Sequence, residues 1–78
     1  MDLQEVTVYH ENSKDLELLA NFLVETFKLN EFRYDEGNPE TKRLPSFFFL
    51  CEAKSVGEIL ISTMKLPGVY VQRAKYDD

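Results

Sequence analysis

The chain has 78 residues, 44% of them hydrophobic and 29% charged, a balance typical of a folded globular protein rather than a disordered one. This length predicts one domain, residues 1–78. Nine lysines and arginines stand against fourteen aspartates and glutamates, giving a net charge of −5. The chain as a whole should therefore repel nucleic-acid phosphates and favour a basic partner.

The cysteine and histidine content excludes several kinds of site. Cys51 is the only cysteine and His10 the only histidine, so neither an internal disulfide nor a Cys/His zinc centre can form. The acidic residues lack EF-hand spacing and the three glycines form no phosphate-binding loop, so we expect no metal and no cofactor. The chain begins without a signal-like segment and has no bilayer-length apolar run. We expect a soluble cytoplasmic protein without membrane contact.

A strand and then a helix are predicted first. Val6 and Val8 alternate with polar residues across residues 3–9, the period of a half-buried strand. Asn12 or Ser13 can cap a helix that runs to about residue 28. Its core-facing stripe recurs every three or four residues: Leu16, Leu19, Ala20, Leu23 and Phe27.

Two further strands are predicted around a long loop. Asn30 suits a left-handed helix end, and residues 31–35 read as a short strand with Phe32 and Tyr34 on one face. Residues 36–46 contain Gly37, Pro39 and Pro45 and show no period, which predicts a loop. Residues 47–51 are apolar at successive positions, as expected of a central strand with apolar side chains on both faces.

A second helix and a last strand complete the predicted order. Ser55 and Glu58 have the spacing of a capping box, which predicts that the helix starts at Ser55. Pro67-Gly68 should end it, and residues 69–76 alternate again. The buried stripe of this helix is expected to contain Val56, Ile59, Leu60 and Met64.

The order βαββαβ predicts an α+β, ferredoxin-like two-layer sandwich: a four-stranded antiparallel sheet with two helices on one face. The other face of the sheet is left uncovered. Since the run 47–51 is continuously apolar, its period cannot decide whether Phe47 and Phe49 or Phe48 and Leu50 lie on the uncovered face.

Catalysis is disfavoured by the residues available. Cys51 and His10 form the only candidate nucleophile pair, but a lone cysteine in an apolar strand is typically a small buried hydrophobe. We interpret His10 as a solvated turn residue. Asp35 and Glu36 lie at a loop mouth, where burial sufficient to shift a carboxylate pKa is not expected. The sequence therefore predicts that the protein is not an enzyme.

RNA binding is the best-known role of a naked sheet of this topology. Lys42-Arg43 ahead of Phe47 and Phe49 superficially resembles the ribonucleoprotein-1 pattern of RNA-recognition motifs. Pro45-Ser46 replaces the basic-glycine opening of that pattern, the first strand offers Thr7 where an aromatic would stack, and the net charge is −5. Nucleic acid is accordingly a disfavoured partner.

Surplus apolar residues point instead to contact with a protein. Leu18, Phe22 and Leu29 project away from the core stripe of the first helix, and Ile61 lies among polar residues of the second. One alternative is that the long loop and the C-terminal tail fold over these residues. The other is an interface.

We therefore expect a small acidic protein-binding module without catalytic activity. Its expected specific form is an inhibitor or adaptor, of the kind phages and immunity systems use, docking on a larger and more basic protein. The expected contacts are Phe47, Phe49 and Tyr70 on the uncovered sheet face, Lys42 and Arg43 in the loop, and Leu18 and Phe22 on the first helix. Two alternatives remain: a regulatory or RNA-binding domain of the same fold, and a homodimer that buries Leu18 and Phe22.

Overall fold

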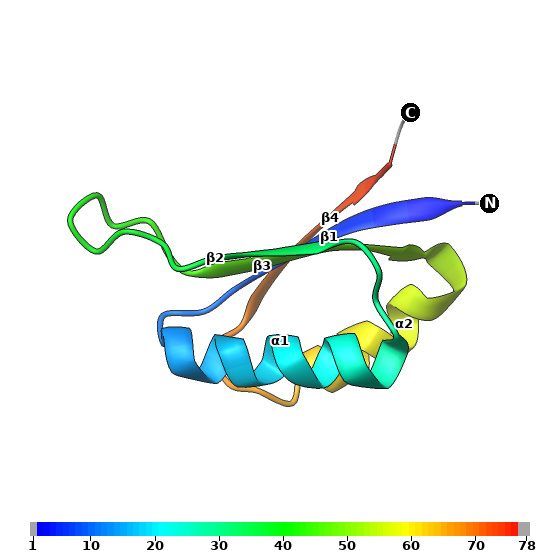
Figure 1. The fold of residues 1–78 in the computed structure, drawn as a ribbon, viewed down its shortest axis with the longest axis horizontal. Helices are drawn as coiled ribbons and strands as arrows, with labels where there is room; N and C mark the ends of the chain where they lie inside the picture. Colours follow the sequence, from blue (N-terminus) through cyan, green and yellow to red (C-terminus); the bar gives the residue numbers. More distant parts are fainter. Residues whose placement is uncertain (1, 77–78) are drawn as a thin grey trace.

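The six predicted elements are present and follow one another in the predicted order. The computed structural model describes residues 2–76. The elements are β1 (Leu3–Tyr9), α1 (Ser13–Phe27), β2 (Phe32–Asp35), β3 (Ser46–Glu52), α2 (Ala53–Thr63) and β4 (Tyr70–Lys75). All strand pairs are antiparallel, in the order β2-β3-β1-β4, and both helices lie on one face of the sheet (Figure 1). The predicted ferredoxin-like sandwich is confirmed.

The pairing of β1 with β3 decides which side chains share a face of the sheet. Val6 lies opposite Phe49 and Val8 lies opposite Phe47. These four side chains point toward the helices and are at most 1% exposed. Because side chains alternate along a strand, Phe48 points to the other face.

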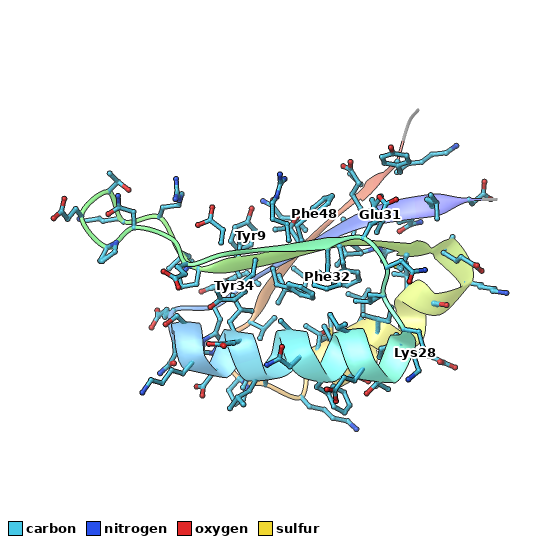
Figure 2. The ribbon with its side chains drawn as sticks, viewed as in Figure 1. Tyr9, Lys28, Glu31, Phe32, Tyr34 and Phe48 are labelled. Carbon is cyan, nitrogen blue, oxygen red and sulfur yellow. The ribbon has the colours of Figure 1, made fainter. Side chains whose placement is uncertain are left out.

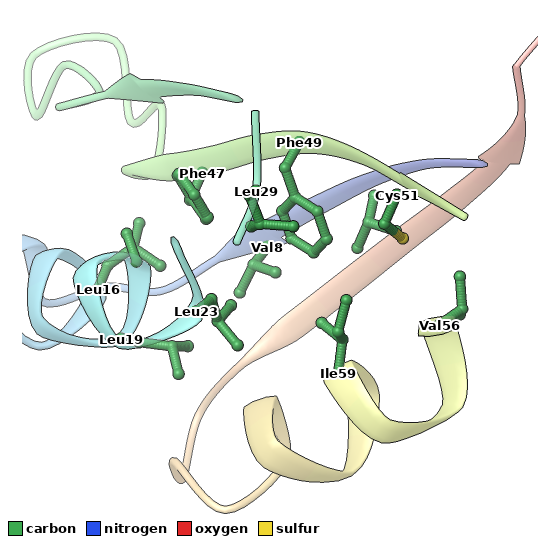
Figure 3. Close-up of a cluster of buried hydrophobic side chains, with 12 residues drawn as sticks. Val8, Leu16, Leu19, Leu23, Leu29, Phe47, Phe49, Cys51, Val56 and Ile59 are labelled. Carbon is green, nitrogen blue, oxygen red and sulfur yellow. The ribbon is translucent and has the colours of Figure 1, made fainter. Parts of the chain in front are cut away.

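The core lies between this face of the sheet and the two helices (Figure 3). The predicted stripe of α1 supplies much of it, and Phe27 packs against its margin. Burial of each large apolar side chain contributes about 1.5–3 kcal/mol to folding. The buried members are Val6, Val8, Leu16, Leu19, Ala20, Leu23, Leu29, Phe47, Phe49, Cys51, Val56 and Ile59.

α1 spans the predicted residues, but only one of its two predicted end residues is correct. Asn12 caps the helix as predicted, since its side-chain oxygen accepts hydrogen bonds from the N–H groups of Lys14 and Asp15. The left-handed residue at the other end is Lys28, with φ 55°, rather than Asn30. This turn carries Leu29 back into the core, so the prediction that Leu29 projects away from the core is wrong.

The prediction for α2 was wrong at both ends. The helix begins at Ala53, directly after β3, and its N-cap residue Glu52 makes no side-chain capping bond. Ser55 therefore lies inside the first turn instead of capping it. The helix ends at Thr63, before Pro67-Gly68, and Met64 is 69% exposed rather than part of the buried stripe. Thr63 is buried, with its hydroxyl donating to the carbonyl of Ile59.

Candidate protein-binding surfaces

The face of the sheet away from the helices carries a group of three aromatic side chains, here called the open-face aromatic group: Tyr9, Phe48 and Tyr70. Tyr9 lies directly opposite Tyr70 across β1 and β4, and Phe48 lies opposite Thr7 in the neighbouring pair. Tyr70 is 63% exposed. Figure 2 shows Tyr9 and Phe48 on this side of the sheet, with Phe32 and Tyr34 on the side of the helices.

Phe47 and Phe49 do not belong to this group, which corrects the sequence prediction. They lie opposite Val8 and Val6, on the face of the sheet that the helices cover, and their side chains are 1% and 0% exposed. Their ring centroids are 5.4 Å apart, within the core. Neither ring is therefore available to a partner on the open face of the sheet. The strand register instead places the side chains of Phe48 and Leu50 on the uncovered face of β3.

The charges on the open face are few and of both signs. The Arg33 guanidinium lies over the Phe48 ring at 5.6 Å, a cation–π contact. Glu5 faces the same side, opposite Leu50. Arg73 lies opposite Val6 and therefore on the helix side of β4. Within residues 2–76, the cation that contacts the aromatic group is Arg33.

Lys42 and Arg43 lie in the loop between β2 and β3, which extends beyond the end of the sheet in Figure 1 and does not cover its open face. Arg43 pairs with Asn38 through two backbone hydrogen bonds of 2.8 and 2.9 Å. Its guanidinium also forms an ion pair with Asp35 at 3.3 Å. Lys42 is exposed. The positive charge of Arg43 is thus already matched by Asp35. The C-terminal tail, which the sequence analysis suggested could cover apolar residues, lies outside the described residues after residue 76.

Leu18 and Phe22 lie on the outer side of the helix layer. They are 69% and 50% exposed, and Ile61 on α2 is 66% exposed. The helices cover one face of the sheet (Figure 1) and Tyr70 lies on the other, so these helix residues and Tyr70 belong to different surfaces. The structure does not bring the seven predicted contact residues together: it places them in the core, on the open face, in the loop and on α1.

His10 and Cys51 are also far apart. His10 lies opposite Pro45, to whose carbonyl its backbone N–H donates, whereas Cys51 lies opposite Gln4. Six residues of strand separate these positions, about 20 Å at the usual rise per residue. Cys51 is buried in the core as predicted, and this burial raises the pKa of its thiol, partly offset by Arg73. The two residues cannot form a nucleophile–base pair.

His10 is not the solvated turn residue that the sequence suggested. It is 8% exposed and both ring nitrogens are bonded: Nδ1 accepts from the N–H of Asn12 at 2.8 Å, and Nε2 lies 2.9 Å from the carbonyl of Pro67. Since Nδ1 accepts, the proton of the neutral ring is on Nε2 and donates to Pro67. No local sequence pattern indicates this contact, because Pro67 is 57 residues away from His10.

Residues 2–76 contain neither a metal-binding cluster nor a membrane-spanning helix. No three histidine, cysteine or acidic side chains lie together in a way that could hold a metal ion. Neither helix of this part of the chain has the length and apolar character needed to cross a membrane.

Comparison with known proteins identifies the fold and no family. No family model and no curated protein matches the sequence. A functionally unknown protein from Pediococcus pentosaceus has a similar structure, with a TM-score of 0.74 and 15% identity over 100% of this chain and 95% of that one. An uncharacterized protein from Thermotoga maritima gives a TM-score of 0.65 and 12% identity over 97% and 96% of the two chains. At these identities the likeness shows a shared fold alone.

Proposed function

We propose that the protein is a non-enzymatic protein-binding module that docks on a larger, more basic protein through the open face of its sheet. The single observation that carries the proposal is the open-face aromatic group, Tyr9, Phe48 and Tyr70, on a face that neither helix covers. An inhibitor or adaptor is its more specific form.

The chemistry of this face fits a protein partner. Aromatic side chains give large contact areas, and tyrosine hydroxyls can hydrogen-bond across an interface. Tyr9 shows such capacity already, since its hydroxyl donates to the side-chain oxygen of Gln72. The net charge of −5 would attract a basic partner and speed the encounter.

The distribution of cations favours a protein over RNA. An RNA-binding sheet needs several lysines or arginines around its stacking aromatics to hold phosphates. Arg33 contacts the open-face aromatic group through Phe48, whereas Arg43 is paired with Asp35 and Arg73 lies on the helix side. The carboxylate of Glu5 on the open face would repel phosphate.

The proposal is tested by affinity capture with two matched double variants. Circular dichroism first confirms that tagged wild type, Phe48→Ser/Tyr70→Ser and Leu18→Ser/Phe22→Ser are folded. Each is then incubated with lysate of the source cells, once untreated and once after nuclease treatment. A captured protein is identified by mass spectrometry, purified and titrated against each variant. Binding should be lost by the sheet variant and kept by the helix variant.

Other outcomes assign a different function. A partner retained by Phe48→Ser/Tyr70→Ser contradicts docking on the open face. Capture that depends on intact nucleic acid supports the RNA alternative. A dimeric mass in light scattering that becomes monomeric only in Leu18→Ser/Phe22→Ser supports self-association through the helices.

A further inference from the structure

The outer edge of β2 is a second surface, separate from the open-face aromatic group. Within the sheet of residues 2–76, β2 pairs with β3 and has no neighbour on its other side. The N–H of Leu50 donates to the carbonyl of Glu31 at 3.0 Å. Backbone groups of an antiparallel strand point alternately to its two neighbours, so Arg33 and Asp35 also bond to β3. The N–H and C=O groups of Phe32 and Tyr34 therefore point outward.

These outward groups remain available for pairing. Among the described residues, no turn, cap or side chain hydrogen-bonds to the backbone of Phe32 or Tyr34. An exposed strand edge of this kind is a template for an added strand. β2 is four residues long, so it can hold only a short segment.

A groove runs beside this edge, between β2 and α1. It has a volume of about 300 Å³. Ala20 and Val24 of α1 form one wall, Phe32 and Tyr34 the other, and Phe47 also lines it. Phe32 is 49% exposed, and its ring centroid is 6.0 Å from that of Phe47. The part of the groove near Phe32 is thus an apolar hollow connected to the core.

The other end of the groove is acidic. The hydroxyl of Tyr34 donates to the carbonyl of Ser13, which places this end at the start of α1. Glu17 and Glu36 line the groove there. Burial raises the pKa of Tyr34, and the charges of both glutamates raise it further, so both carboxylates act on this ring. Arg33 also lines the groove, but its guanidinium lies over Phe48 on the opposite face.

We propose that this groove binds an extended segment of another protein, which pairs with the free edge of β2 as an added strand. Side chains two residues apart on such a strand face the same side. The segment would therefore place an apolar side chain beside Phe32 and a lysine or arginine, two residues away, beside Glu17 and Glu36. This inference does not depend on the function proposed for the open face.

Synthetic peptides test the inference directly. The probe is a blocked peptide of about eight residues, a usual strand length, with leucine and lysine two positions apart in a threonine-rich background. It is titrated into isotope-labelled wild-type protein and followed by NMR. We expect saturable shift changes at β2 and in α1 around Ala20, below about 1 mM peptide. The exchange of the Phe32 and Tyr34 amides should slow at the same time.

Three control peptides separate strand addition from general adhesion. In the first control peptide, leucine and lysine are adjacent, so their side chains lie on opposite faces of the strand. In the second, the amides that face β2 are N-methylated, which removes the backbone hydrogen bonds. In the third, glutamate replaces lysine and reverses the charge. Each should bind at least about tenfold more weakly. The proposal is overturned if the N-methylated or the adjacent-residue peptide binds as tightly as the probe peptide. It is also overturned if the shift changes are centred on β4 or on the open face, or if no saturable changes are seen.

The acidic end is tested with a double variant of the protein. Glu17→Gln/Glu36→Gln keeps the shape of the groove and removes its charge. It should weaken the lysine peptide by about two- to fivefold, the range of exposed ion pairs. A peptide with norleucine in place of lysine should bind the variant and the wild type equally. An unchanged affinity of the lysine peptide would contradict the assigned role of the two glutamates.

Discussion

His10 is a structural residue that connects the two halves of the chain. Its ring bonds both to Asn12, the cap of α1, and to the carbonyl of Pro67 ahead of β4. Gly68 has a φ of +80°, and a Cβ there would lie 3.5 Å from the ring. The tight turn after α2 is therefore built around this histidine, and a glycine fits its backbone conformation without strain.

Replacing His10 should destabilise the fold. We expect His10→Ala to lower the free energy of unfolding by about 1–3 kcal/mol, because it leaves the part-buried Asn12 N–H and Pro67 carbonyl without partners. The measurement is urea denaturation at neutral pH. Glu11→Ala, at an exposed neighbouring position, is the control and should change it by less than about 0.5 kcal/mol. Equal effects of the two substitutions would refute the structural role.

Cys51 makes stability depend on pH under alkaline conditions. Its thiol pKa is raised by burial above the ordinary value of 9.0. Below that value the folded and unfolded chains both carry the neutral thiol. As pH rises through it, the unfolded chain ionises first, so the free energy of unfolding falls until the folded pKa is reached. Tyr34 acts in the same direction at higher pH, from its ordinary value of 10.0.

Denaturation curves between about pH 7 and pH 11 measure this effect. Wild type should lose more stability across the range than Cys51→Ala, which lacks the thiol. Tyr34→Phe is the matched control and should remove only the part of the loss at the highest pH. Parallel curves for wild type and Cys51→Ala would show that the thiol contributes nothing to the pH dependence.

At the scale of the elements, the two helices begin in different ways. α1 follows a polar connection and is capped by Asn12, whose side chain accepts two backbone hydrogen bonds. α2 follows β3 without a loop, and Ser55 lies in its first turn. Asn12→Ala should cost about 0.5–2 kcal/mol of stability, whereas Ser55→Ala should cost less than about 0.5. If urea denaturation showed a comparable loss of stability for Ser55→Ala, Ser55 would be a capping residue of α2 after all.

The elements themselves could be predicted because each has a local pattern. Alternation around Val6 and Val8 and the leucine stripe of α1 are readable within a few residues. The start of α2 is different, because a capping box reports only that a helix is nearby. At the actual start of α2, the N–H of Ala53 donates to the carbonyl of Asp2 at 2.9 Å. A local pattern cannot indicate a contact between residues so far apart in the sequence.

At the scale of the whole molecule, the candidate site depended on a property that sequence alone does not fix. The run from Phe47 to Cys51 is apolar at every position, so its hydrophobic pattern does not indicate which side chains face the helices. Only the pairing with β1 turns Phe47 and Phe49 inward and Phe48 outward. The prediction of an uncovered sheet face with aromatic side chains was therefore possible, whereas the identity of those side chains required the register.

The same register predicts opposite responses of neighbouring phenylalanines. Phe49 is 0% exposed and packs against Phe47, so Phe49→Ala leaves a cavity and should cost about 3–5 kcal/mol. In a chain of 78 residues that is much of the expected stability. Phe48→Ala removes a ring from the open face and should cost about 1 kcal/mol or less, while leaving the core intact.

Urea denaturation of the two variants under one set of conditions makes this comparison. Near-ultraviolet circular dichroism should also change for Phe49→Ala and stay close to wild type for Phe48→Ala, because only the first substitution disturbs the packing between sheet and helices. A larger loss of stability for Phe48→Ala than for Phe49→Ala would mean that Phe48, and not Phe49, faces the core. The aromatic face available to a partner would then be the one carrying Phe47 and Phe49, and the function proposed for Phe48 and its neighbours would fail with it.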